Sequence, residues 1–346
     1  AAAWTGYAVC GEGPWRRIPD DVLQPGTCRF VQADEPLPRH VDAVLDALHA
    51  LVEDPEGVAI VIARDPLTGV PDERVRPAFG DGIVPQGTRA REGDALIAMD
   101  RPVTPAVLAL AAAAGYDEIP IIRPPIVGTL VLGSSLLAAG MPRHGRVRDA
   151  LGNTVPAFVG ALGARGNPPV RAPDTRDLLL TEIDDANVDI LVTTGSTAPG
   201  PDNHVRQVLR DLDARWLIDG VAVTPGAQML LAKLPDGRFL VGLPGEPASA
   251  LAGLVTLVAP LVTAMRGAPP AEYPAAVLMD DTPAPEFADD TRLTPVRLQV
   301  IDGEAVAHPL DDAGPAQLAG WANAEAIAII PPGAGMRGDV VSVIPV

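Results

Sequence analysis

The sequence predicts an α/β protein: a three-layer domain with a mostly parallel sheet, flanked by a β-rich N-terminal module and a small C-terminal β-barrel. Three observations support this class. Apolar β-like runs alternate with helical patterns between Ile126 and Met265. Glycine-rich loops follow several of these runs, and short β-like runs separated by proline and glycine fill the segments on either side. We therefore divide the chain into residues 1–88, 89–125, 126–268 and 269–346.

The N-terminal module is expected to be β-rich with one helical excursion. Its strands are predicted at Tyr7–Cys10, Cys28–Gln32 and Val58–Ala63. A helix is predicted within Leu37–Leu51, because apolar residues recur there at helical spacing.

Residues 89–125 are expected to form a connecting element. Thr104 and Pro105 are typical of a helix start, since threonine caps the first turn and proline fits its first position. This helix should run to about Ala114 and end at Gly115. A strand is predicted over Glu118–Arg123.

Strands and helices alternate in the central domain, which indicates parallel strand pairing. The predicted strands are Ile126–Leu132, Asp189–Thr194, Trp216–Val223, Gln228–Leu234 and Phe239–Gly242. The predicted helices run from Asn153 or Thr154 to Ala164, from Thr175 to Ala186, from Asp202 to Leu212 and from Pro247 to Met265. The last is apolar enough to suggest a membrane span, but Pro260 interrupts it and a sheet-edge loop precedes it. We expect a buried helix there.

The C-terminal domain is predicted to consist of short strands after a proline-rich connection. The expected strands are Arg292–Ile301, Glu304–Pro309, Ala326–Ile330 and Val340–Val346.

Three loops follow strands of the central domain: the first loop, Gly133–Ser135, the second loop, Gly195–Asp202, and the third loop, Leu243–Ser249. Because parallel strands end at one edge of a sheet, these loops should converge. A strand, a glycine-rich turn and a helix start leave backbone N–H groups free to hold an anion. The candidate binding residues are Gly133, Ser134, Gly195, Ser196, Thr197, Pro199, Gly200, Pro244, Gly245, Glu246, Pro247 and Ser249.

Each of these residues also has a plain structural interpretation. The glycines serve equally as turn residues, and the serines as partners of the turn backbone. Asp202 is also a suitable helix N-cap, and Glu246 a solvated loop charge. Ser196 and His204 invite a nucleophile–base interpretation, but the sequence gives no geometric support for it.

Charge and composition exclude several classes. The net charge is −18 and no basic stripe is visible, so nucleic acid and anionic membrane surfaces are not expected partners. No C-x-x-C motif and no histidine pair at metal-ligand spacing occurs. The start, Ala1–Tyr7, lacks the basic and apolar segments of a signal peptide, so a cytoplasmic location is expected.

Four segments in this order resemble a known family. They are Trp4–Val9, similar to Met-Asp-Gly-Tyr-Ala-Val, the second loop, the third loop and Leu318–Pro331. Together they resemble the molybdopterin molybdotransferases of the MoeA and gephyrin E-domain type. The resemblance covers nearly the whole chain and implies a MogA-like central domain.

The resemblance also implies a function. Members of this family insert molybdenum from molybdate into adenylylated molybdopterin, with Mg²⁺ or a similar divalent ion. It implies a pterin substrate, a homodimer and a molybdopterin adenylyltransferase as partner. By the same resemblance, Asp202, Thr5 and Ser135 are the catalytic positions, Asp202 is the metal ligand and Lys233 contacts the ligand.

The chain departs from the family at charged positions. Thr5 stands where the family has aspartate, and Ser134 and Ser135 replace an aspartate and a glutamate. The family's Lys-Pro-Gly-Lys-Pro becomes Thr224–Gln228, and glutamate replaces asparagine at Glu246. Losing two lysine contacts would lower the affinity for an anion by a factor of about 10²–10⁴.

These departures leave three functions open. The chain is a molybdotransferase, or a degenerate paralogue that binds a pterin, a nucleotide or a partner protein without inserting metal. The third alternative is another nucleotide chemistry on a CinA-like domain, against which the C-terminal β module argues.

Overall fold

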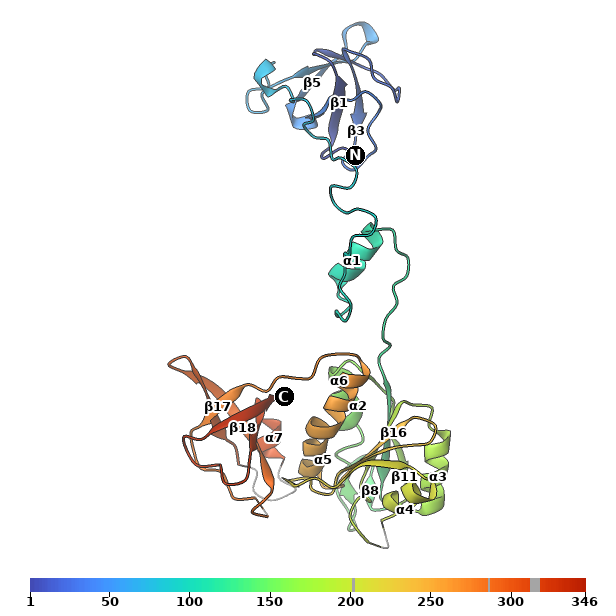
Figure 1. Cartoon of the computed structure of the whole chain (residues 1–346), viewed down its shortest axis with the longest axis vertical. Helices are drawn as coiled ribbons and strands as arrows, with labels where there is room; N and C mark the ends of the chain where they lie inside the picture. The colour runs from blue at the N-terminus through green and yellow to red at the C-terminus, as the bar shows by residue number, and fades with distance from the viewer. Residues whose placement is uncertain (201–202, 286, 312–317) are drawn as a thin grey trace. The chain divides into compact units, whose positions relative to one another are not determined.

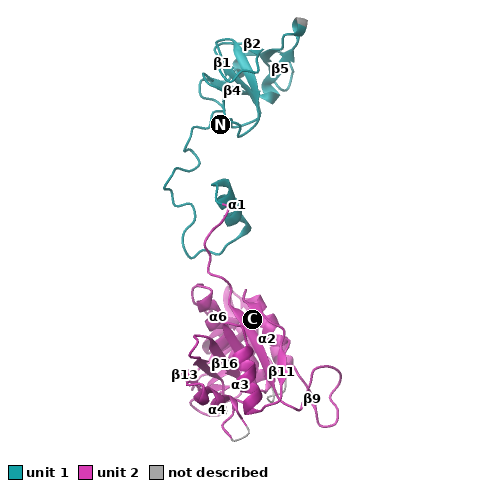
Figure 2. Cartoon of the chain, turned by 90° about the vertical axis from the view of Figure 1, so that its right-hand side faces the viewer, with its two compact units in different colours: residues 1–116 teal, residues 117–346 magenta. Residues whose placement is uncertain are grey.

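The computed structural model describes residues 1–200, 203–285, 287–311 and 318–346 (Figure 1). The chain forms two compact units, residues 1–116 and 117–346 (Figure 2). The predicted division into four parts stays a prediction, and each unit is described by itself below.

The first unit contains a six-stranded mixed sheet in the order β4-β1-β3-β2-β6-β5. Its strands are β1 (Gly6–Cys10), β2 (Trp15–Arg17), β3 (Thr27–Val31), β4 (Ala43–Asp46), β5 (Ala50–Glu53) and β6 (Ile60–Ala63). β2 and β3 pair in parallel and the other pairs are antiparallel. Trp15 and Cys28 lie in the core on one face of this sheet.

The helix predicted within Leu37–Leu51 is wrong. That segment forms β4, a single 3₁₀ turn over Ala47–His49, and β5. Val44 and Leu45 are both buried but belong to different core clusters, as expected of a strand whose side chains alternate between faces. Pairing of β4 with β1 outweighs the helical spacing, and Leu48 is 69% exposed.

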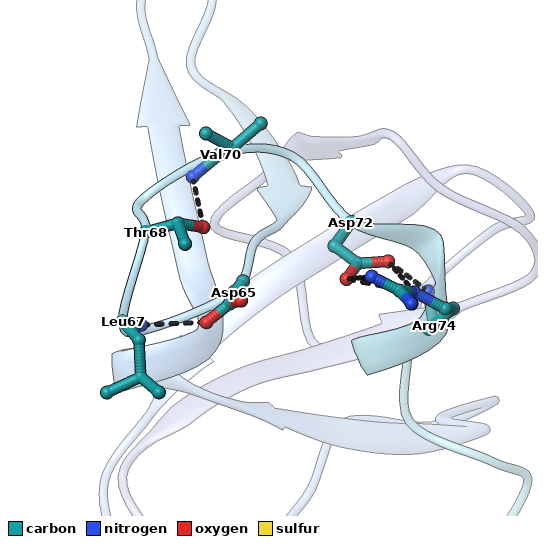
Figure 3. Close-up of polar contacts among 6 residues, drawn as sticks. All are labelled: Asp65, Leu67, Thr68, Val70, Asp72 and Arg74. Carbon is teal, nitrogen blue, oxygen red and sulfur yellow. Dashed lines mark hydrogen bonds and ion pairs between the residues drawn. The ribbon is translucent and has the colours of Figure 1, made fainter.

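A polar turn follows β6 (Figure 3). Asp65 accepts a hydrogen bond from the Leu67 amide at 2.8 Å, and Asp72 accepts one from the Arg74 amide at 2.9 Å. The Arg74 guanidinium also donates to Asp72, which holds the pKa of that carboxyl below its usual range. The carboxylates of this turn thus accept hydrogen bonds from the turn's own amides, so we interpret the turn as structural.

Helix α1 (Pro105–Ala113) confirms the predicted capping. The Thr104 hydroxyl accepts a hydrogen bond from the Val107 amide at 3.3 Å, and Gly115 follows the helix at φ +87°. The strand predicted over Glu118–Arg123 is wrong, because no other strand pairs with that segment in the described structure.

The second unit is built on a sheet whose centre is parallel, in the order β7-β12-β16. The bounds are β7 (Ile126–Leu132), β12 (Ile190–Thr194) and β16 (Phe239–Leu243). The flanking strands are β10 (Arg165–Gly166) and β11 (Val170–Ala172) beside β7, and β15 (Leu230–Lys233) and β13 (Arg215–Asp219) beyond β16. β15 is antiparallel to β16, so the predicted sheet is mostly but not wholly parallel.

Helices cover both faces of this sheet, which confirms the three-layer prediction. One core contains residues of α2 (Thr154–Ala161) and of the continuous helix Pro247–Met265, which comprises α5 (Pro247–Gly253), a π segment (Leu254–Val258) and α6 (Ala259–Met265). The other contains residues of α3 (Arg176–Asp185) and α4 (Val205–Asp211). By length and hydropathy Pro247–Met265 is a candidate membrane span, but its Leu254 and Val258 are fully buried in the core.

Two predicted boundaries of this domain are wrong. The helix expected from Asp202 begins at Val205, with His204 at its N-cap, and Asp202 itself lies outside the described residues. The strand expected over Trp216–Val223 ends at Asp219. Val223 and Thr224 form β14, which instead pairs with the C-terminal domain.

The C-terminal strands close into a barrel through the circuit β18-β19-β17-β21-β20-β18. They are β17 (Ala275–Leu278), β18 (Thr291–Ile301), β19 (Glu304–Pro309), β20 (Ala326–Ile330) and β21 (Val340–Pro345), with the short helix α7 (Ala319–Ala322) before β20. The barrel and its four predicted strands are confirmed. Sequence reasoning missed β17, which is short and begins with two alanines.

An ion pair joins the residues that precede β7 and β12. Arg123 donates to both oxygens of Asp189 at 2.7 Å, and the Ile126 amide donates to the same carboxylate at 2.7 Å. The hydrogen bonds from Arg123 are the main reason why the pKa of Asp189 is lowered. A lowered pKa means that the stabilisation is present above the ordinary carboxyl pKa and is lost as pH falls through the folded-state value.

We predict that Asp189→Asn lowers the free energy of unfolding at pH 7 by about 1 kcal/mol, a value reduced by solvent screening of Arg123. The difference from wild type should shrink as pH falls below about 4. Urea unfolding of the full chain across pH checks this, with the exposed Asp117→Asn as charge-matched control. A deficit that stays constant down to pH 2 would contradict the assignment.

Candidate functional site

The three loops meet at one edge of the central sheet. Thr194, the last residue of β12, is in register with Val131 of β7 and Leu243 of β16. The Gly195 amide donates to the Leu243 carbonyl at 2.9 Å, which ties the second loop to the third. We name this edge the rim.

Glycine is required where the loops touch. A Cβ on Gly195 would lie 3.1 Å from the Leu132 carbonyl oxygen, and a Cβ on Gly245 would lie 3.3 Å from the Gly195 Cα. Gly195 also adopts φ +89°, a conformation that strains residues with a Cβ. The predicted convergence of the loops is therefore confirmed, and Gly195 is its central contact.

Several backbone amides of the rim have no hydrogen-bond partner within the part of the chain that the structure describes. They are those of Ser134, Ser135, Ser196, Thr197, Ala198, Gly200, Gly245 and Glu246. Such amides are the donors with which protein loops hold oxyanions. The first two loops supply most of them.

Hydrogen bonds that involve side chains join the second loop to the start of α4. Ser196 adopts φ +61°, and its hydroxyl accepts a hydrogen bond from the His204 amide at 2.7 Å. The His204 ring nitrogen Nδ1 lies 3.2 Å from the Asp174 carboxylate. Arg206 donates to the Thr197 carbonyl at 2.9 Å, and Thr197 is buried. The Ser196 hydroxyl thus supports the start of α4, as its structural interpretation anticipated.

Glu246 is not a solvated loop charge, so that prediction is wrong. It is the N-cap of α5, where its two oxygens accept hydrogen bonds from the Ala248 amide at 2.9 Å and the Ser249 amide at 2.7 Å. Pro247 occupies the first helical position and has no amide to donate. The third loop therefore fills the anion-binding end of its own helix with its own carboxylate.

The first loop is exposed and tied to the segment that returns to it. Ser134 and Ser135 lie before β8 (Leu136–Leu137), which pairs with β9 (Val147–Arg148). Arg146 donates to the Ser134 carbonyl at 3.1 Å, and the Val147 amide donates to the Ser135 carbonyl at 3.1 Å. The serine hydroxyls have no partner in the described structure.

The segment in which the resemblance places the family's lysines lies beside the third loop. A Cβ on Gly226 would lie 3.1 Å from the Ser249 carbonyl oxygen. Thr224, which replaces the first of those lysines, donates its hydroxyl to the buried Asp290 at 2.8 Å. This side of the rim thus has no lysine and instead holds a satisfied polar pair.

Lys233 does not join the rim. It pairs with Phe239 at the start of β16, four residues or about 13 Å from the strand end. Its ammonium lies 5.5 Å from the centre of the Phe239 ring. Within the second unit, β15 runs antiparallel and carries Lys233 to the edge opposite the three loops, and its predicted ligand contact stays a prediction.

The other predicted residues are distributed as follows. Gly133, Pro199, Gly200 and Pro244 lie in the loops of the rim. Thr5 belongs to the first unit, where its hydroxyl accepts a hydrogen bond from the Ala33 amide at 3.1 Å. The predicted catalytic and metal-binding role of Asp202 falls outside the described residues.

The described residues of the rim do not fit a Mg²⁺ site. Magnesium prefers oxygen ligands that include carboxylates, and the one carboxylate among the described residues of these loops, Glu246, is engaged by two amides. No group of three or more His, Cys, Asp or Glu residues suited to a metal occurs among the described residues.

Sequence reasoning missed one carboxylate close to the first loop. The Asp149 side chain is 2% exposed, bridges to Arg171 at 2.7 Å and accepts hydrogen bonds from the Leu151 and Gly152 amides. Its signal was an aspartate shortly before a predicted helix, which is typical of a capping residue. Asp149 fixes the segment that returns from the first loop.

We predict that Glu246→Ala lowers the free energy of unfolding by about 1 kcal/mol, because two helix amides lose their acceptor. Glu246→Asn should recover most of that loss, since asparagine also caps helices. Thermal and urea unfolding of the full chain measure both variants. Equal stability of wild type and Glu246→Ala would contradict the capping role.

We predict that Gly195→Ala destabilises the protein by at least about 1 kcal/mol more than Gly237→Ala. Both glycines adopt positive φ, but a Cβ on Gly237 meets nothing within 4 Å. The difference therefore isolates the contact between loops from backbone strain. Identical losses in urea unfolding would show that Gly195 is only a turn residue.

Comparison with known proteins agrees with this architecture. A probable molybdopterin-binding domain matches residues 128–264, and the MoeA C-terminal region, domain IV, matches residues 275–346. Together they cover more than half of the chain.

Curated relatives match over part of their length. The molybdopterin molybdenumtransferase of Bacillus subtilis (strain 168) is 30% identical over 264 residues, which are 75% of this chain and 60% of that protein. The protein of the same name from Staphylococcus aureus (strain Mu50) is 28% identical over 191 residues, which are 54% of this chain and 45% of that protein. The chain thus spans 60% or less of the length of these two relatives.

Solved structures share the fold. A molybdopterin biosynthesis MoeA protein from Pyrococcus horikosii superposes with a TM-score of 0.71 at 22% identity, covering 99% of this chain and 86% of the other. Along the chain, the probable molybdopterin-binding domain precedes the MoeA C-terminal region. The chain therefore belongs to the MoeA family.

Proposed function

We propose that the protein acts in molybdenum-cofactor biosynthesis as a molybdopterin molybdotransferase, which inserts molybdenum from molybdate into adenylylated molybdopterin. The observation that carries the proposal is the rim, where three loops bring unpartnered amides together at one sheet edge. Both substrates are oxyanions, and such donors suit them.

The chemistry asked of the protein is mainly positioning. Amides of the first and second loops would hold phosphate and molybdate oxygens, and the hydroxyls of Ser134 and Ser135 would add donors. The Gly195–Leu243 hydrogen bond fixes the second loop against the third before a ligand arrives. Preorganised donors of this kind stabilise developing negative charge without reorganising.

Several finer features are part of the proposal. We infer a homodimer, a cytoplasmic location and a supply of substrate from a molybdopterin adenylyltransferase. Family membership supports these, together with the need for an adenylylated substrate. Mg²⁺ is left to the experiment, because the described rim residues provide no free carboxylate for it.

The test is reconstitution with purified full-length chain, adenylylated molybdopterin and molybdate, with and without Mg²⁺. Activation of a cofactor-free molybdoenzyme is the readout, and omission of the chain is the control. We expect activation that depends on the chain and on molybdate. Binding of adenylylated molybdopterin without activation would favour the degenerate paralogue, and neither binding nor activation would overturn the proposal.

A further inference from the structure

Three arginines stand on the segment that returns to the first loop. Residues 143–148, here named the arginine loop, read Arg-His-Gly-Arg-Val-Arg. The arginine loop comprises the end of the connection that follows β8 and the two residues of β9, and Figure 2 shows the chain beside β9 projecting from the second unit. All six residues are exposed, in contrast to the buried strand β7 that precedes the first loop.

The guanidinium groups of the arginine loop form no ion pair in the described structure. Arg146 donates to the Ser134 carbonyl at 3.1 Å and to the Leu136 carbonyl at 3.4 Å. Arg148 donates to the Leu137 carbonyl at 3.4 Å. These three contacts are all to neutral carbonyl oxygens, so each side chain keeps N–H donors and an uncompensated positive charge.

This position contrasts with the rest of a chain whose net charge is −18. An anionic ligand is repelled by the protein as a whole and needs local positive charge to bind. Several other arginines of the second unit are already in ion pairs, as Arg171 is with Asp149 and Arg238 with Asp236. The arginine loop is adjacent to unpartnered amides, because Arg146 touches the Ser134 backbone.

The third loop disfavours binding of an anion at the start of α5, which leaves the first and second loops as the anion-binding part of the rim. Glu246 already occupies the amides at the start of α5, and its negative charge opposes a second anion there. The Thr224–Gln228 segment beside it carries no cation. The donors left on the rim therefore lie mostly on the first and second loops, and Arg146 contacts the first loop.

We propose that Arg143, Arg146 and Arg148 are the cationic part of the anion site and bind the phosphate-bearing end of the ligand against the first loop. A guanidinium suits this role because its planar N–H groups bind phosphate oxygens in pairs. The inference rests on the proposed function and deepens it. It assigns to the arginine loop the charge that the absent lysines would have supplied.

The test measures binding of inorganic pyrophosphate to the full chain by calorimetry at low salt. Arg146→Gln should weaken binding at least tenfold, the triple variant Arg143→Gln/Arg146→Gln/Arg148→Gln at least a hundredfold, and Arg146→Lys less than Arg146→Gln. The control is Arg165→Gln/Lys233→Gln, which removes positive charge from the opposite edge of the same sheet. It should bind as wild type does, and circular dichroism verifies folding of each variant.

Two outcomes overturn the inference. Wild type that does not bind pyrophosphate, or a folded triple variant that binds it as tightly as wild type, would show that the arginine loop is not the cation source. The reconstitution assay separates this failure from failure of the proposed function. If the triple variant activates the molybdoenzyme as well as wild type does, only the arginine assignment is overturned. If wild type does not activate the enzyme, the proposed function is overturned.

Discussion

The parallel pairing of β7, β12 and β16 is the constraint on which the rest of the second unit depends. Their register brings three strand ends level, and the hydrogen bond from Gly195 to Leu243 ties two of the following loops together. Buried valine, leucine and isoleucine on both faces hold this register, because a slip of one residue would turn each side chain to the other face. The position of the rim loops therefore depends on the packing of buried side chains on both faces of the sheet.

Most of the fold could be predicted from the sequence, because local patterns and the tertiary structure agree there. The strands of the barrel and the centre of the sheet alternate or run apolar between glycine and proline turns. The predictions failed where long-range pairing decides. Leu37–Leu51 has helical spacing but pairs as strands, and Glu118–Arg123 has apolar residues but no partner strand among the described residues.

The site could be predicted in its place but not in its charges. Loop convergence follows from strand order, yet the direction of β15, which removes Lys233 from the rim, is a property of the whole sheet. Glu246 looks like a surface charge in sequence, and only the start of α5 shows that its carboxylate caps the helix. The third loop carries an internal anion, and the arginines beside the first loop form no ion pair with any described residue, so the rim is electrically asymmetric.

Ligand binding at the rim requires that the amides of the first and second loops form one anion site. The most direct measurement is the ¹H–¹⁵N spectrum of the deuterated full chain during titration with inorganic pyrophosphate. We expect concerted shifts of the Ser134, Ser135, Ser196 and Thr197 amides, whereas the Ala248 and Ser249 amides stay bound to Glu246 and change little. Shifts confined to the opposite edge of the sheet, or none at the rim at saturating pyrophosphate, would contradict it.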